Sequence, residues 1–150
     1  MISKGKTGAM GLLLALTAAP GMAAEDSREL VEMPAMMQEH MLANMRDHLK
    51  ALDEILGFLA EGNVNEAGKI AENRLGMSSL ELHGASHIAK FMPDAMAAAG
   101  TEMHRAASRF VIAAQDAEFA PGKEAQHAVY GALQDVTSAC NACHQAYRIR

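Results

Sequence analysis

The sequence predicts an all-α protein, arranged as an antiparallel four-helix bundle. Half of the residues (50%) are apolar, chiefly Ala, Leu and Met, which lose little entropy in helices, whereas aromatic residues make up only 4%. Apolar residues recur at steps of three and four in four segments with short joins, as in helices that pack as antiparallel neighbours. With 150 residues and a charged fraction of 21%, the chain is expected to form one globular domain.

Residues 1–24 have the features of a cleaved export signal. Two lysines form a basic start, and the apolar run at 8–19 is too short to span a bilayer. Pro20 ends this run, and small residues up to Ala24 offer a cleavage site. Nothing after this site resembles a stop-transfer segment. We therefore expect a periplasmic protein without a stable membrane anchor, whose bundle domain comprises residues 25–150.

The first helix is predicted from Pro34 to Glu61. Proline is tolerated in a first turn, and Gly62 can end the helix. Its apolar stripe consists of Leu42, Met45, Leu49, Leu52, Leu56 and Leu59. The centre line of the stripe (Met45, Leu52 and Leu59) is expected to face the core.

The second helix is predicted from Asn65 to Lys90, although it contains three glycines that each weaken a helix by roughly 1 kcal/mol relative to Ala. These glycines are Gly68, Gly76 and Gly84. Residues 92–100 contain a proline and are predicted to be a connection that is partly helical. Thr101 is expected to cap a third helix that ends before Pro121.

The last helix is predicted over residues 123–147. Its apolar stripe, at steps of four, three, four, three and four, is Val129, Leu133, Val136, Cys140, Cys143 and Tyr147. Both cysteines of the chain therefore belong to the face that is expected to be buried.

The five residues from Cys140 to His144 match C-x-x-C-H, the pattern of covalent haem attachment. On a helix, the i to i+3 spacing puts both sulfurs on one side, where they can form thioethers to two vinyl groups of one porphyrin. His144 is four residues beyond Cys140, so its imidazole projects from the same side towards the iron. The motif predicts one haem c, held by Cys140 and Cys143, with His144 as the proximal iron ligand.

Two other interpretations of these residues stay open. A C-x-x-C disulfide would not need His144, and no strand-helix alternation of a thioredoxin-like domain surrounds it. A zinc site would need one or two more ligands at tetrahedral distances. The haem interpretation is preferred because a disulfide leaves His144 without a role and a zinc site needs ligands beyond the motif.

The segment from Leu133 to Arg148 resembles the C-terminal end of cytochrome c prime and its low-spin relatives, the class II c-type cytochromes. It combines C-x-x-C-H with a tyrosine and a basic residue three and four positions after the histidine. The resemblance implies a four-helix bundle with the haem motif near the C-terminus of the last helix. It implies that Arg148 lies close to the proximal haem face, although a cation at a helix C-terminus also interacts favourably with the macrodipole. It further implies a homodimer formed through the first helices.

The resemblance also implies that the distal side of the iron faces a residue of the first helix. The heptad phase of that helix puts Met45 at this position, with Met41 and Met37 as alternatives, and a thioether there would complete His/Met ligation. The alternatives are methionines that only fill the core, which leave the iron five-coordinate.

These features favour a monohaem cytochrome that transfers electrons between redox partner proteins, and the alternative is a five-coordinate haem protein that binds NO or CO. A less favoured hypothesis is a periplasmic copper or nickel binding or sensing bundle, because His83 and His87 are four residues apart. No catalytic motif is found, so an enzyme is not expected. A net charge of -5 gives no reason to expect nucleic-acid binding.

Overall fold

The computed structural model describes residues 25–150, and the predicted export signal lies outside the described residues. The chain is mostly helical, which confirms the all-α prediction. The long helices are α1 (Ala35–Ala60), α2 (Val64–Arg74), α4 (Asp94–Phe119) and α5 (Lys123–Ala146). The shorter elements are β1 (Glu29–Leu30), η1 (Met77–Ser79), α3 (Ala85–Ile88), η2 (Ala89–Phe91) and β2 (Tyr147–Arg148). Within residues 25–150, every helix is too short or too polar to cross a membrane.

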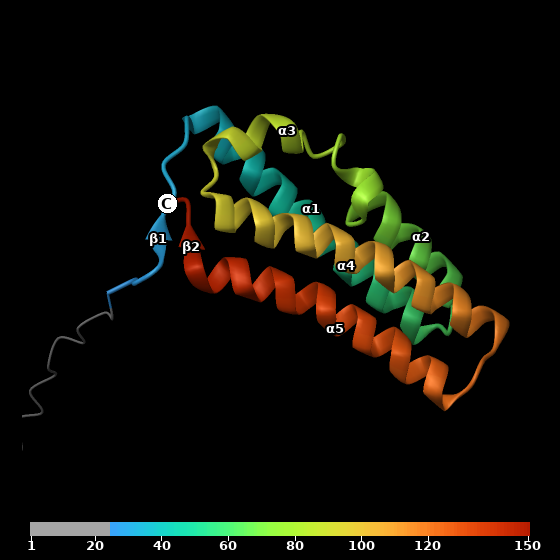
Figure 1. Ribbon diagram of the computed structural model, residues 1–150. Coiled ribbons are helices and arrows are strands. Elements are labelled where there is room, and N and C mark those ends of the chain that lie inside the picture. Colours follow the sequence, from blue (N-terminus) through green and yellow to red (C-terminus); the bar gives the residue numbers. More distant parts are fainter. Residues whose placement is uncertain (1–24) are drawn as a thin grey trace, which may run out of the picture.

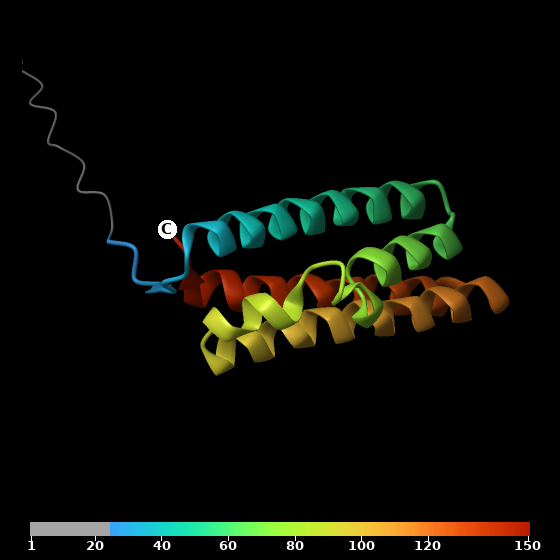
Figure 2. The same cartoon turned by 90° about the horizontal axis from the view of Figure 1, so that it is seen from above.

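The long helices lie along one another. Helix α4 packs against α5 and against α2, and α2 also packs against α1 (Figure 1). The starts of α1 and α4 lie at the same end of the molecule as the end of α5 (Figure 1). Seen from above, α2 lies between α1 and α4 (Figure 2). Because α2 has 11 residues and its neighbours have 26, it separates them over only part of their length.

The prediction of one continuous second helix from Asn65 to Lys90 is wrong. Helix α2 ends at Arg74, and the backbone at Gly76 is extended, with a ψ of 179°. At Gly84 the backbone is left-handed, with a φ of 59°, a conformation that favours glycine. Two of the glycines that weaken the helix pattern therefore break the helix, and the chain continues through η1, α3 and η2.

The segment 92–100, predicted to be a partly helical connection, is helical over most of its length. Helix α4 begins at Asp94, directly after Pro93, whose fixed φ suits a helix start. Thr101 therefore does not cap a helix. Its hydroxyl lies inside α4 and donates to the carbonyl oxygen of Ala97 at 2.9 Å. Helices α1 and α5, in contrast, match their predicted bounds within one residue.

The buried face of α1 is rotated by about 40° around the helix axis from the predicted centre line, because the buried line of Met41, His48 and Ile55 precedes the predicted line by four residues. The buried residues of α1 are Met41, His48, Ala51 and Ile55. The predicted stripe includes Leu49 and Leu56, which are 70% and 54% exposed. The predicted residues Met45, Leu52 and Leu59 are half-buried at the border of this face, and His48 lies nearer its centre.

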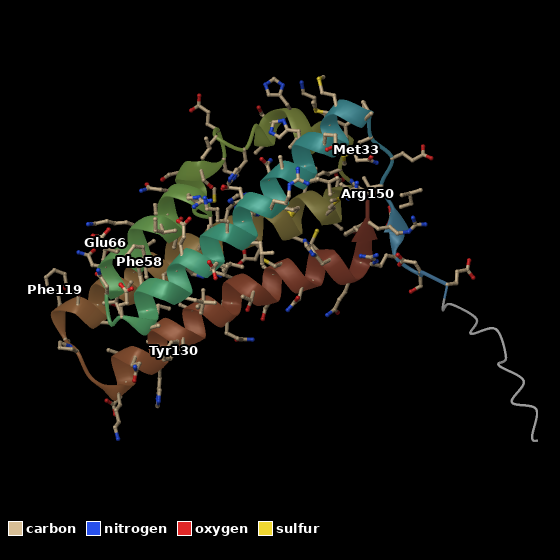
Figure 3. The ribbon with its side chains drawn as sticks, turned by 180° about the vertical axis from the view of Figure 1, so that it is seen from behind. Met33, Phe58, Glu66, Phe119, Tyr130 and Arg150 are labelled. Carbon is tan, nitrogen blue, oxygen red and sulfur yellow. The ribbon has the colours of Figure 1, made fainter. Side chains whose placement is uncertain are left out.

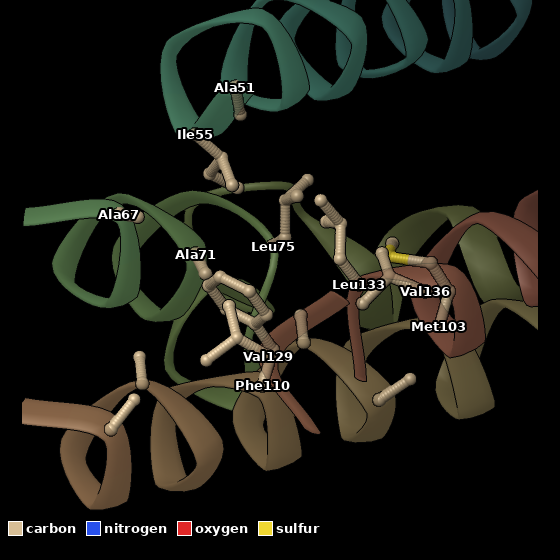
Figure 4. Packing of buried hydrophobic residues seen from close by; sticks show 14 residues of the cluster. Ala51, Ile55, Ala67, Ala71, Leu75, Met103, Phe110, Val129, Leu133 and Val136 are labelled. Carbon is tan, nitrogen blue, oxygen red and sulfur yellow. The ribbon is translucent and has the colours of Figure 1, made fainter. Parts of the chain in front are cut away.

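The main core occupies the part of the molecule where all four long helices meet. Phe110 is fully buried and is surrounded by small and branched side chains (Figure 4). Its neighbours include Ala67 and Ala71 of α2, whose small side chains permit close helix packing. Cys140 packs against this core from α5.

A second apolar cluster lies at the end of the molecule where β1 pairs with β2. The two strands are parallel, with Glu29 opposite Tyr147 and Leu30 opposite Arg148. The buried members of this cluster are Val31, Met41, Ile88 and Met96. Figure 3 shows Met33 at this end of the molecule, near Arg150. The pairing fixes the segment before α1 against the segment after the C-x-x-C-H motif.

Candidate cofactor and metal site

A cavity of about 390 Å³ opens beyond the end of α2, between α1, α4, the end of α5 and the segment around α3. This volume is in the range of small-molecule and cofactor pockets, roughly 300–1,000 Å³. Five methionines line it: Met41, Met45, Met92, Met96 and Met103. The early end of α2 is therefore what creates a cavity large enough for a ligand.

Most of the residues predicted from the sequence line this one cavity. Cys143 and His144 reach it from α5, Met45 from α1 and Arg148 from β2. Cys140 is the exception, because it contacts the main core instead. Both cysteines are free thiols, and burial raises the pKa of each of them. They are therefore protonated at neutral pH, and neither forms a disulfide.

The three methionines considered as distal ligands differ in their positions. Met41 is 5% exposed, and both Met41 and Met45 line the cavity. Met37 belongs to the second apolar cluster but is not part of the cavity wall. The geometry thus narrows the distal candidates on α1 to Met41 and Met45.

Arginines are the main charged groups of the cavity wall. Arg28, Arg148 and Arg150 all line it. The Nε atom of Arg148 is buried without a hydrogen-bond partner and lies 3.8 Å from Asp26. Arg28 donates to the same carboxylate at 2.7 Å, and this contact is the main reason that the pKa of Asp26 falls to about 2. A carboxylate of a bound molecule could accept a hydrogen bond from this unpartnered Nε.

Three buried histidines converge on another part of the same cavity wall. His48 comes from α1, His83 from the segment before α3, and His104 from α4. Their exposed fractions are 8%, 5% and 7%. One nitrogen of each imidazole lies within 4.8 Å of one nitrogen of the other two. The set therefore has the composition and spacing of a candidate metal site.

Burial keeps these histidines neutral. It lowers the pKa of His48 to about 4, with further lowering from the neighbouring imidazoles. Burial also lowers the pKa of His83 and of His104. Neutral imidazole is the form that binds metal ions, because its unprotonated nitrogen has a free lone pair.

Comparisons with protein-family models, with curated proteins and with solved structures find no match for this chain.

The predicted pair of His83 and His87 does not form. His87 is exposed, whereas His83 is buried and faces the other two histidines. Sequence reasoning missed His48 and His104 as site residues. One sequence signal could have identified His48. It lies seven residues after Met41 and seven before Ile55, so it shares a helix face with two apolar residues.

Proposed function

We propose that the mature chain is a periplasmic monohaem c-type cytochrome that transfers electrons, folded as an antiparallel four-helix bundle. The observation that carries this proposal is that Cys143 and His144 line the same cavity as Met45, which is almost 100 residues earlier in the chain. Thiol, imidazole and thioether groups are the set that His/Met-ligated c-type haems use.

The residues of the cavity suit a haem. Cys140 and Cys143 would hold the porphyrin through thioethers, and His144 would bind the iron on the proximal side. The methionine-rich wall matches the apolar porphyrin face, and the unpartnered Nε of Arg148 suits a propionate. Cys140 contacts the core in this structure, so attachment requires a change of its side-chain direction or of the last turns of α5.

When bound, the haem would supply one-electron redox chemistry. The chain itself contributes two effects. Its apolar wall excludes water, which strengthens electrostatic interactions at the site. Cationic arginines near the group favour the iron state with the lower positive charge, and they therefore raise the reduction potential.

The alternative function is binding of NO or CO by a five-coordinate iron. Met41 and Met45 both line the cavity, and this supports a thioether ligand and hence electron transfer. Reduced protein that binds CO readily would favour the gas-binding alternative, because a strong methionine ligand competes for the same position.

A homodimer through α1 is part of the proposal. Leu49 and Leu56 lie on α1 seven residues apart and are mostly exposed, so they form an apolar stripe on one helix face. Sedimentation of the mature protein at several concentrations tests this association. Leu49→Glu is expected to give a monomer, and a wild-type protein that stays monomeric contradicts the dimer.

The decisive experiment is mass spectrometry of chain exported in a host that attaches haem. We expect the mature mass to exceed the polypeptide mass by one haem, and the protein to be red with a Soret band. Cys140→Ala combined with Cys143→Ala should abolish the added mass. His144→Gln should keep the attachment but alter the spectrum, whereas His127→Gln, at an exposed position of the same helix, should alter neither. A colourless wild-type protein without the added mass refutes the proposal.

A further inference from the structure

We propose that His48, His83 and His104 bind one transition-metal ion, Zn²⁺ or Cu²⁺, at a site separate from the C-x-x-C-H motif. The three residues come from three separate segments, and one nitrogen of each lies within 4.8 Å of the others. With metal–nitrogen bonds of about 2.0–2.1 Å, tetrahedral ligands are roughly 3.3 Å apart. Small side-chain rotations are enough to close the remaining gap.

The hydrogen bonds around His104 orient it as a ligand. Its Nδ1 donates to the carbonyl oxygen of Leu75 at 2.7 Å. This bond fixes the proton on Nδ1 and leaves the lone pair of Nε2 free. Metal-binding histidines usually donate their other ring N–H to a backbone carbonyl or a carboxylate in this way.

For His83, the group that faces the outer ring nitrogen is a carboxylate and not a backbone carbonyl. Its Nδ1 lies 3.5 Å from Nε2 of His48, inside the cluster. Its Nε2 is buried without a hydrogen-bond partner and points towards Asp47, whose carboxylate oxygen is 4.0 Å away. Asp47 is therefore placed to accept the Nε2 proton and to balance part of the charge of a bound cation.

The donor set selects the kind of ion. Three neutral nitrogens suit zinc and copper, whereas Mg²⁺ and Ca²⁺ require oxygen ligands. Ser79 supplies a hydroxyl 3.4 Å from Nδ1 of His83 and 3.5 Å from Nδ1 of His104. The fourth position can be taken by this oxygen or by water from the cavity, which the histidines also line.

The test uses the exported mature chain, purified without a histidine tag and dialysed against a chelator. Calorimetric titration with Zn²⁺ and with Cu²⁺ is expected to give one ion per chain for at least one of them, and Mg²⁺ should give none. His48→Gln, His83→Gln and His104→Gln should each weaken binding by more than the roughly 10- to 100-fold typical of losing an outer partner. His87→Gln, at an exposed position near His83, is the matched control and should bind as the wild type does.

Two variants that keep all three histidines control for the possibility that a histidine variant loses metal binding because it misfolds. Arg74 pairs with both Asp47 and Glu54, but only Asp47 approaches His83. Asp47→Asn is expected to weaken binding roughly 10- to 100-fold, while Glu54→Gln should not. A wild-type chain that takes up neither ion, or equal affinities for Asp47→Asn and Glu54→Gln, overturns the inference. The histidines would then form only a hydrogen-bonded core cluster with Ser79.

The proposed haem site and the proposed metal site share one cavity but no ligand, so the two proposals can fail separately. Elemental analysis of one sample counts iron for the haem and zinc or copper for the histidines. The double cysteine variant should lose iron and still bind one ion at the histidines. The histidine variants should keep the covalent haem mass.

Discussion

Nε2 of His48 lies 3.5 Å from Nδ1 of His83, although the two residues are 35 positions apart in the chain. The contact depends on the end of α2 at Arg74, which pairs with Asp47 and Glu54 of α1. A helix rises about 1.5 Å per residue, so a continued α2 would carry His83 on the order of 13 Å past Arg74. The same break produces the cavity beside α1.

The metal-free protein is expected to lose stability as the pH falls from about 6.5 to about 4. Burial lowers the pKa of His48 to about 4, whereas in the unfolded chain it is near 6.5. Between these values only the unfolded chain binds the proton, so the stabilisation is complete above pH 6.5 and is lost towards pH 4. In this range the free energy of unfolding falls by up to about 1.4 kcal/mol per pH unit because of this group. The negative charge of Asp47 raises the pKa of His48, and the positive charge of Arg74 lowers it further.

Urea unfolding of chelated protein at pH 7.5, 6 and 5 measures this slope. Burial lowers the pKa of His83 and His104 as well, so these residues add to the effect in the same direction. His48→Gln should flatten the pH dependence, and His87→Gln should leave it unchanged. An equal slope in these two variants would show that His48 is not the titrating group.

Met45→Ala is expected to convert a six-coordinate haem spectrum into a five-coordinate one, because Met45 lines the cavity that Cys143 and His144 share. Absorption spectra of the oxidised and reduced protein measure the change. Met36→Ala is the control, since Met36 is on the same helix and is 74% exposed. If Met45→Ala keeps its spectrum and Met41→Ala changes it, Met41 is the ligand instead.

Arg148→Glu is expected to lower the reduction potential, because it replaces a cation of the cavity wall with an anion and so disfavours the more electron-rich iron. Arg105→Glu makes the same charge change at an exposed position of α4. Potentiometric titration of both variants separates a local from a general charge effect. Equal reduction potentials for the two variants would indicate that Arg148 interacts only with the macrodipole at the C-terminus of α5.

Phe110→Ala should lower the free energy of unfolding by about 3–5 kcal/mol, because it leaves a cavity in the main core. Phe119→Ala removes the same side chain from the same helix at a position that is 88% exposed, and it should change stability by less than about 0.5 kcal/mol. Denaturant unfolding compares them. Similar losses would contradict the placement of the core around Phe110.

Gly84→Ala should destabilise the protein by at least about 1 kcal/mol, since the backbone there has a φ of 59°. An added Cβ would also lie 2.9 Å from Cε1 of His40. Gly57→Ala should have the opposite sign, with a gain of up to about 1 kcal/mol, because Gly57 is inside α1 with open space around it. Thermal unfolding of both variants tests the difference.

The sequence by itself determined the fold class and the ends of the first and last helices. Pro34 and Gly62 flank α1, and the apolar spacing of α5 extends through Cys143. These signals are local, because helix starts, stops and periodicity depend on residues within a few turns. The C-x-x-C-H motif could be recognised for the same reason, because its three functional side chains lie within five consecutive residues.

Only the tertiary structure decided which face of α1 is buried and which side chains meet. The leucines predicted that Met45, Leu52 and Leu59 form the centre of the buried face, but these side chains are half-buried at its border, and His48 is buried. The association of His48 with His83 and His104 has no local signal, because three segments create it and each histidine alone resembles an ordinary surface residue. Burial and proximity are properties of the assembled helices, and they converted three scattered imidazoles into one candidate metal site.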